Sequence, residues 1–162
     1  MSRIYTVPFS GTLTAAGTDS DWLSLQAATN KPTRLLGIMI GQISEVGDAQ
    51  EEGLRLSILR LAATFTVGSG GTAITPAAMD STDTVAFGGT ARCNDTTVAT
   101  TAGATTTLFE IGWNLRMAPW DWYPVDVRFA PIARAGEGLI VRCQTTLADD
   151  ATAQFTFIIE EF

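Results

Sequence analysis

The chain has 162 residues, of which 46% are hydrophobic and 17% charged, and its formal net charge is −7. This length suffices for one core, so we expect a single domain over residues 1–162. The acidic balance, with Lys31 as the only lysine, argues against binding to nucleic acid or to an anionic membrane, because both partners need grouped positive charge.

Apolar and other residues alternate along most of the chain, which is the period of a β-strand. Segment 35–40 is instead apolar on both faces, and the alternation of segment 54–61 slips at Ile58 and Leu59, which predicts a bulge or bend. Only segment 49–54 has room for a helical turn. The alternating runs lie at 4–9, 22–27, 109–117, 125–129, 139–144 and 153–160.

Turn residues separate these runs, giving about eight short strands, no long helix and no repeat. Such a pattern is typical of an all-β sandwich or barrel. In the run at 22–27 we expect Leu23 and Leu25 on one face and Trp22 on the other. The predicted core contains Phe109, Ile111, Trp113, Leu115, Leu139, Val141, Phe155, Phe157 and Ile159.

Segment 68–107 is rich in Gly, Ala and Thr and carries few charges. Small side chains let a backbone lie close to another surface and lose little entropy on ordering. We therefore predict an extended arm or loop that contacts other protein chains, and the alternative is that it folds back over the sheets of its own chain.

Three aromatic residues, Trp120, Trp122 and Tyr123, crowd one predicted loop between Pro119 and Pro124. Such a cluster can anchor an interface, cover the open end of a sandwich or stack on sugar rings.

Catalytic chemistry has little support in this sequence. The absence of histidine excludes Ser-His-Asp and Cys-His arrangements and removes the commonest metal ligand. Paired carboxylates remain, at Asp19 with Asp21, Asp80 with Asp83, Glu51 with Glu52, and Asp149 with Asp150, and we interpret them as turn residues. We therefore predict no enzymatic activity, no cofactor, no metal and no small-molecule substrate.

An acidic loop contains Glu45, Asp48, Glu51 and Glu52. It is interpreted as a solvated turn, with a calcium site or contacts to basic residues of a partner as alternatives. Cys93 and Cys143 lack the spacing of a zinc site and are expected to be buried free thiols, although a disulfide is possible if their strands are neighbours.

The strings Gly-Gly-Thr-Ala-Ile-Thr-Pro at 70–76 and Ala-Arg-Cys-Asn-Asp-Thr-Thr at 91–97 resemble a family of small all-β structural proteins of tailed bacteriophages. Further markers are Asn30-Lys31-Pro32 and the run 136–142. In that family a jelly-roll domain decorates or cements the capsid.

The resemblance implies a jelly-roll-like antiparallel sandwich that binds the major capsid protein, a homotrimer, and a location on the capsid surface after synthesis in the bacterial host cytoplasm. No run approaches the ~18 apolar residues of a membrane span, and the start at 1–8 enters a strand-like alternation instead of a signal peptide. The alternative function is a carbohydrate-binding module or phage adhesin that uses Trp120, Trp122 and Tyr123. The candidate interface residues are Leu35, Met39, Thr72, Ile74, Pro76, Trp120, Trp122 and Tyr123.

Overall fold

A computed structural model describes residues 2–13, 19–44, 53–62, 64–117 and 119–162 of the chain. They form strands joined by turns, with one 3₁₀ turn, η1 (Val127–Phe129), as the only helical element in these ranges. The strands are β1 (Arg3–Leu13), β2 (Ser20–Gln26), β3 (Thr33–Gln42), β4 (Gly53–Leu61), β5 (Phe65–Thr66), β6 (Thr72–Ile74), β7 (Ala77–Ala78), β8 (Thr90–Cys93), β9 (Thr100–Thr101), β10 (Thr105–Asn114), β11 (Trp120–Trp122), β12 (Ile132–Ala133), β13 (Gly138–Cys143) and β14 (Ala151–Glu161).

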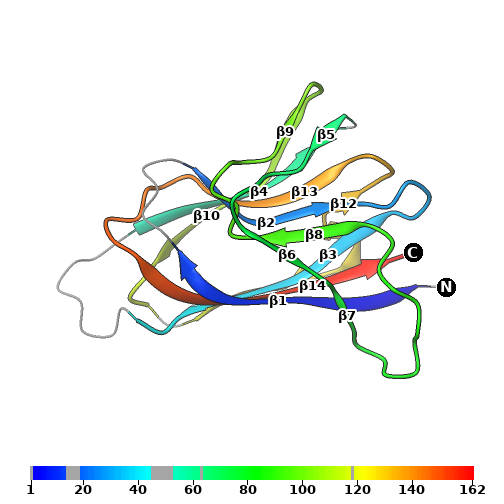
Figure 1. The fold of residues 1–162 in the computed structure, drawn as a ribbon, viewed down its shortest axis with the longest axis horizontal. Helices are drawn as coiled ribbons and strands as arrows, with labels where there is room; N and C mark the ends of the chain where they lie inside the picture. The colour runs from blue at the N-terminus through cyan, green and yellow to red at the C-terminus, as the bar shows by residue number, and fades with distance from the viewer. Residues whose placement is uncertain (1, 14–18, 45–52, 63, 118) are drawn as a thin grey trace.

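Two antiparallel sheets pack face to face as a sandwich, and both termini lie at the same end (Figure 1). Sheet A has the order β11-β3-β14-β1-β7, with β12 also paired to β3, and sheet B has the order β10-β4-β13-β2-β8-β6. The ribbon of β5 and β9 stands away from both sheets (Figure 1). The all-β sandwich predicted from the sequence is confirmed.

The long strands pair in a nested order. The first, β1, pairs with the last, β14, and inside that pair lie β2 with β13, β3 with β11, and β4 with β10. Successive strands therefore cross between the sheets, which is the two-Greek-key arrangement of a jelly roll.

The core lies between the sheets. Of the residues predicted there, Phe109 and Ile111 are only partly buried, because β10 is an edge strand of sheet B. The others are buried, namely Trp113, Leu115, Leu139, Val141, Phe155, Phe157 and Ile159.

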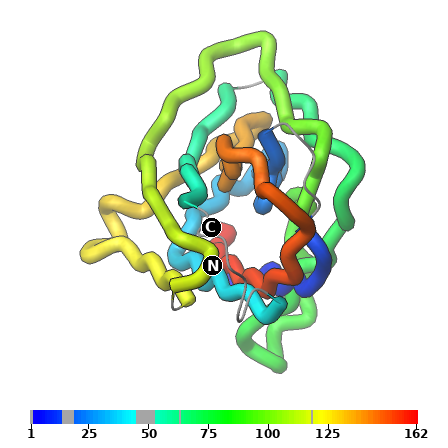
Figure 2. Tube along the Cα trace, turned by 90° about the vertical axis from the view of Figure 1, so that its left-hand side faces the viewer, coloured from blue at the N-terminus to red at the C-terminus, as the bar shows by residue number. Residues whose placement is uncertain are grey.

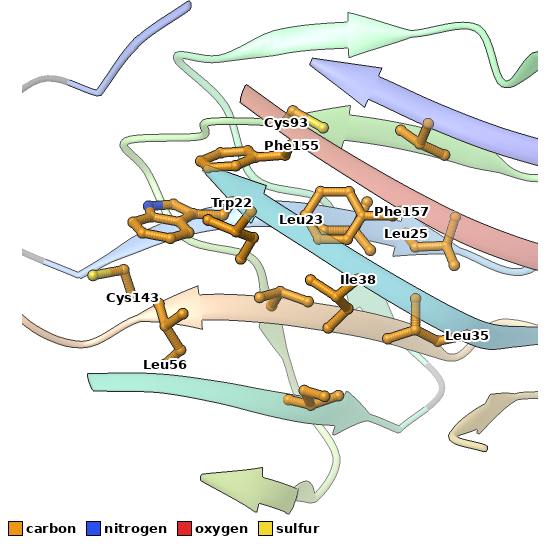
Figure 3. Packing of buried hydrophobic residues seen from close by; sticks show 14 of the residues in the cluster. Trp22, Leu23, Leu25, Leu35, Ile38, Leu56, Cys93, Cys143, Phe155 and Phe157 are labelled. Atoms are coloured by element: carbon orange, nitrogen blue, oxygen red, sulfur yellow. The ribbon is translucent and has the colours of Figure 1, made fainter. Parts of the chain in front are cut away.

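The expected outward orientation of Trp22 is wrong. In β2, Leu23 pairs with Val141 and Asp21 with Arg142, so Trp22 is an extra residue at a bulge. Its wholly buried ring stacks on Phe155 at a centroid distance of 4.8 Å (Figure 3).

The predicted irregularity at Ile58 and Leu59 exists, but the extra residue is Leu108 in the partner strand β10. The alternation of β4 is interrupted at these two residues because both are apolar. Ile58 belongs to the main core, whereas Leu59 belongs to a second hydrophobic cluster. That cluster, on the other face of sheet B, contains Leu59, Leu61, Phe65, Ala99 and Ile140.

Much of segment 68–107 folds back onto its own chain. Strands β6 and β8 extend sheet B, and β7 pairs with β1 at the edge of sheet A. The loop that follows β7 is held by an ion pair from Arg3 to Asp83 and by a hydrogen bond from the Tyr5 hydroxyl to the Val85 carbonyl. The segment therefore covers one side of the sandwich, as in the fold-back alternative, whereas residues near β9 project from it (Figure 2).

Cys93 and Cys143 are buried and are not joined in a disulfide, as expected. They lie on β8 and β13, and β2 runs between these strands. Strands two places apart are separated by about 9.6 Å, which exceeds the Cα separation that a disulfide can bridge. Figure 3 shows the two sulfur atoms well apart.

Candidate protein-docking surface

An excursion, residues 123–131, interrupts the edge strand of sheet A. Trp122 pairs with Ile38 and Ile132 pairs with Arg34. The chain therefore advances ten residues from Trp122 to Ile132, while the partner strand β3 advances only four. The surplus residues cannot remain in the ladder and loop outward, and Figure 2 shows them as a yellow protrusion from the trace.

The excursion exposes large apolar side chains. Val125 is 100% exposed, Phe129 65%, Val127 51% and Tyr123 50%. The alternation of Val125, Val127 and Phe129 was expected to form a strand with one face in the core, and this expectation is wrong, because η1 and its flanking loop occupy these positions. A grouped set of exposed apolar side chains is a feature of protein interaction sites.

The charges of the excursion neutralise one another. Asp126 caps η1 by accepting a hydrogen bond from the backbone N–H of Arg128, and its carboxylate also pairs with the Arg128 guanidinium at 3.0 Å. The hydrogen bonds from the Arg128 side chain and backbone hold the pKa of Asp126 below its usual range. A partner that covered this loop would therefore meet a paired charge and apolar groups.

The excursion is anchored at both of its ends. The Tyr123 ring lies directly over Gly37, where an added Cβ would come within 2.6 Å of Cε1 of the ring. At the other end, Ala130 and Pro131 are buried, and the Pro131 carbonyl accepts a hydrogen bond from the backbone N–H of Leu35 at 2.9 Å. The loop is thus pre-organised, which lowers the entropic cost of binding a partner.

A hollow of about 350 Å³, here called the side hollow, lies between the excursion and sheet B. Arg60, Leu108, Phe109, Arg128, Phe129, Ala130, Pro131 and Ile132 line it. Beside it runs β10, which is the terminal strand of sheet B within the described residues.

Of the predicted aromatic cluster, Trp120 and Trp122 point inward and pack against the core. Trp122 contacts the Phe109 ring at a centroid distance of 5.3 Å. These two residues act as core cover, and Tyr123 is the exposed member of the cluster.

The candidate interface residues of β3 divide between the two faces of sheet A. Leu35 is wholly buried in the core, so its prediction as an interface residue is wrong. Met39 is partly buried and faces outward, where it lines a shallow hollow with Pro119, Asp121 and Thr156.

The remaining candidates, Thr72, Ile74 and Pro76, lie at the opposite side of the sandwich from the excursion. Ile74 and Pro76 line an apolar groove of about 460 Å³ together with Phe87 and Val67. Thr72 is exposed at the edge of sheet B. The structure does not bring these residues together with Tyr123.

The carboxylates of the described residues can be placed individually. The described part of the chain contains no group of three or more Cys, Asp or Glu residues placed to hold a metal ion. Asp21 is buried in an ion pair with Arg142, and Asp80 caps a turn through Thr82. Glu45, Asp48, Glu51 and Glu52 all lie outside the described residues. The same ranges hold no helix long and apolar enough to span a membrane.

The residues that the sequence interpretation missed are Val125, Val127 and Phe129. Their alternation was visible, but periodicity does not say whether an apolar face meets a core or solvent. Comparisons with protein-family models, curated proteins and solved structures gave no match for this chain.

Proposed function

We propose that this chain is a structural virion protein that decorates and cements the capsid of a tailed bacteriophage by binding its major capsid protein. In this proposal it acts as a homotrimer at the capsid surface, without cofactor or catalysis. The excursion 123–131 is its main contact with the capsid.

The exposed apolar excursion is the observation that carries the docking role. Val125 and Phe129 are held in solvent by a loop that is capped and anchored, although burying each of them would gain roughly 1.5–3 kcal/mol. A jelly-roll sandwich also occurs in viral capsid domains, and it needs complementary surfaces rather than an active site. The resemblance of the 70–76 and 91–97 strings to phage decoration proteins supplies the kind of partner.

The carbohydrate alternative has weaker support. Stacking on a sugar needs an exposed aromatic face, and the rings of Trp120 and Trp122 pack against the core. Tyr123 alone remains, and its ring already lies over Gly37.

Co-sedimentation with capsids that lack the protein tests the proposal. Val125→Asp is expected to weaken capsid binding by at least about tenfold without changing the fold, because the Val125 side chain is fully exposed and would be desolvated on docking.

Met79→Asp is the matched control, since Met79 is 63% exposed on the opposite side of the sandwich, within segment 68–107. Retained binding of Met79→Asp with loss in Val125→Asp supports the excursion. The reverse result would move docking to the segment 68–107, and no binding by the native protein would remove the capsid proposal.

A further inference from the structure

We infer that the side hollow binds a carboxylate side chain of the partner protein and that Arg60 is the residue that recognises it. The apolar walls of the hollow hold the methylene or aromatic groups beside that carboxylate. This inference rests on the proposed docking role of the excursion, but it does not require the partner to be a capsid protein.

The first argument is the position of Arg60 among the basic residues of the chain. Most of them form ion pairs, whereas Arg60, Arg116 and Arg134 form none with a described residue. Arg116 and Arg134 are exposed, and Arg60 is partly buried. Its register partners on the neighbouring strands are Thr106 and Leu139, which carry no charge. Arg60 is therefore partly shielded from water without an anion among the described residues.

The second argument is the lining of the side hollow, which contains two arginines and no acidic residue. One of them, Arg128, donates to both carboxylate oxygens of Asp126 through Nε and Nη2, so its charge is already matched. The charge of Arg60 is not matched within the described residues, although the chain as a whole has a net charge of −7. The whole chain repels an acidic group, so recognition of that group here has to come from direct contact with the guanidinium.

The third argument is that the excursion and the side hollow form one continuous surface, because residues 128–131 belong to both. A partner that buries Phe129 in the wall of the hollow also covers Arg60. Covering a guanidinium with apolar groups alone leaves a charge desolvated and unpaired, which opposes binding. A carboxylate in the hollow removes that penalty, and a lysine of the partner would increase it. The excursion thus supplies apolar contact area, and Arg60 selects among partner surfaces.

The fourth argument is the kind of group that the hollow fits. The guanidinium of an arginine is a planar fork that matches both oxygens of a carboxylate. Leu108, Phe109 and Phe129 supply apolar walls beside it. A glutamate side chain, or an aspartate next to an apolar residue, presents both features together.

A small acid tests the hollow without any capsid. Hydrocinnamate joins a phenyl ring to a carboxylate, and hydrocinnamamide is its uncharged match. In NMR titrations of the full-length protein, the acid should shift the Arg60 Nε–H signal and the backbone signals at 108–109 and 128–132, with a dissociation constant in roughly the millimolar range. The amide should bind roughly fivefold more weakly. Equal binding of both compounds, or no binding of the acid, would overturn the inference.

Arg60→Gln tests the arginine. This variant should bind the acid and the amide equally, and Arg60→Lys, which keeps the charge without the fork, should keep part of the preference for the acid. Arg116→Gln is the matched control, because Arg116 is exposed and is not among the residues that line the side hollow. Circular dichroism checks that each variant is folded, and Arg60→Lys carries the test if Arg60→Gln is not. The full native preference for the acid in a folded Arg60 variant would contradict the role of Arg60.

Capsid co-sedimentation tests the same contact with the proposed partner. Arg60→Gln should bind capsids roughly fivefold more weakly, and Arg60→Glu more weakly still, because its carboxylate would face that of the capsid. Capsids in which one surface Glu or Asp is replaced by Lys are then screened with Arg60→Glu. One such capsid should restore binding of Arg60→Glu and bind the native protein more weakly. Restoration by none of them would contradict the inference.

Three further outcomes separate this inference from other assignments. If hydrocinnamate binds with micromolar affinity, a free acid occupies the hollow and the partner side chain is refuted. If capsids bind the native protein and Arg60→Glu equally well, the capsid proposal stands and the Arg60 inference fails. If the acid binds through Arg60 and the native protein does not bind capsids, the Arg60 inference stands and the capsid proposal fails.

Discussion

Gly37 determines how closely the excursion lies on the sandwich. Tyr123 covers this residue, and a methyl group there would lie 2.6 Å from the ring. Tyr123 is half exposed, so the ring can swing outward instead of straining the sheet. The residue thus links the outer face of sheet A to the position of the candidate docking surface.

We predict that Gly37→Ala displaces Tyr123, lowers the unfolding free energy by up to about 1 kcal/mol and weakens docking. Gly112→Ala is the matched control, because Gly112 is also a strand residue and a Cβ there would meet nothing within 4 Å. The control should be neutral or stabilised by up to about 1 kcal/mol. Urea unfolding of both variants measures the difference, and equal stabilities would mean that Tyr123 does not pack on Gly37.

At the scale of elements, buried ion pairs fasten the segments that follow β4 onto the outer face of sheet B. Arg142 on β13 pairs with the wholly buried Asp21 on β2 at 2.6 Å and also donates to the Ala99 carbonyl. Asp21 in turn accepts a hydrogen bond from the Ala99 backbone N–H. Arg92 and the buried Asp95 form a second pair beside it. These contacts connect strands to a segment of sequence that has few apolar residues of its own.

Removing Arg142 should destabilise the fold strongly and make its stability depend on pH. Burial raises the pKa of Asp21, whereas the hydrogen bond and charge of Arg142 oppose that shift. Arg142→Met would leave the carboxylate buried and unpaired, at a cost of about 3 kcal/mol at neutral pH. The pKa of Asp21 in the folded state would then rise further above its value in the unfolded state.

The sign of the pH dependence follows from that difference. A carboxyl with a raised folded pKa binds its proton more tightly in the folded state, so the stability deficit of Arg142→Met should shrink as the pH falls and grow as it rises through the raised pKa. Unfolding curves of the native protein and the variant over a pH series measure this. The double variant Asp21→Asn, Arg142→Met should lose the pH-dependent part, and a deficit independent of pH in Arg142→Met would contradict the argument.

The excursion itself should be dispensable for folding. Deleting 124–129 leaves Tyr123, Ala130 and Pro131 between Trp122 and Ile132, a number that matches the residues of β3 between their partners Ile38 and Arg34. We expect a folded protein with native-like circular dichroism and an unfolding free energy within about 1 kcal/mol of the native value, since the deleted side chains are largely exposed. Capsid binding should be lost, and a deletion variant that fails to fold would show that the excursion supports the sandwich.

Most strands could be predicted because each long strand has a buried face and a period of two. Trp22 and Leu108 could not be placed, since a bulge moves one side chain to the other face without changing composition. The nested pairing order is also absent from the local pattern, because it depends on contacts between distant strands.

The candidate site was only partly accessible to sequence reasoning. Tyr123 was identified from aromatic crowding, while Trp120 and Trp122 shared that signal and proved to be core cover. Val125 and Phe129 have the alternation of a half-buried strand, and only the surplus length between β11 and β12 reveals that they are exposed.

At the scale of the whole molecule, the two sides of the sandwich differ. The side formed by β6 and β7 consists of segments that fold back, and the side formed by β10 and β11 has the side hollow and the apolar excursion. A third region, the end away from the termini, carries Asp19 and Asp149 in its turns. Docking through the apolar side and docking through this acidic end would respond differently to salt.

We predict that capsid binding depends only weakly on ionic strength. Two charge pairs on the side formed by β10 and β11 are already matched, since Asp126 pairs with Arg128 and Glu110 with Arg55, and in the side hollow Arg60 is left for a partner. One exposed ion pair contributes at most about 1 kcal/mol, so affinity should change by less than about tenfold between low and high salt. Burial of Val125 and Phe129 is insensitive to charge screening by salt, so its contribution to binding would remain.

Co-sedimentation over a salt series measures the effect, with sulfate and chloride compared at equal ionic strength because sulfate strengthens apolar burial. Binding that disappears at high chloride would contradict this prediction. It would indicate that the end with Asp19 and Asp149 docks against a basic surface of the partner, instead of the side formed by β10 and β11.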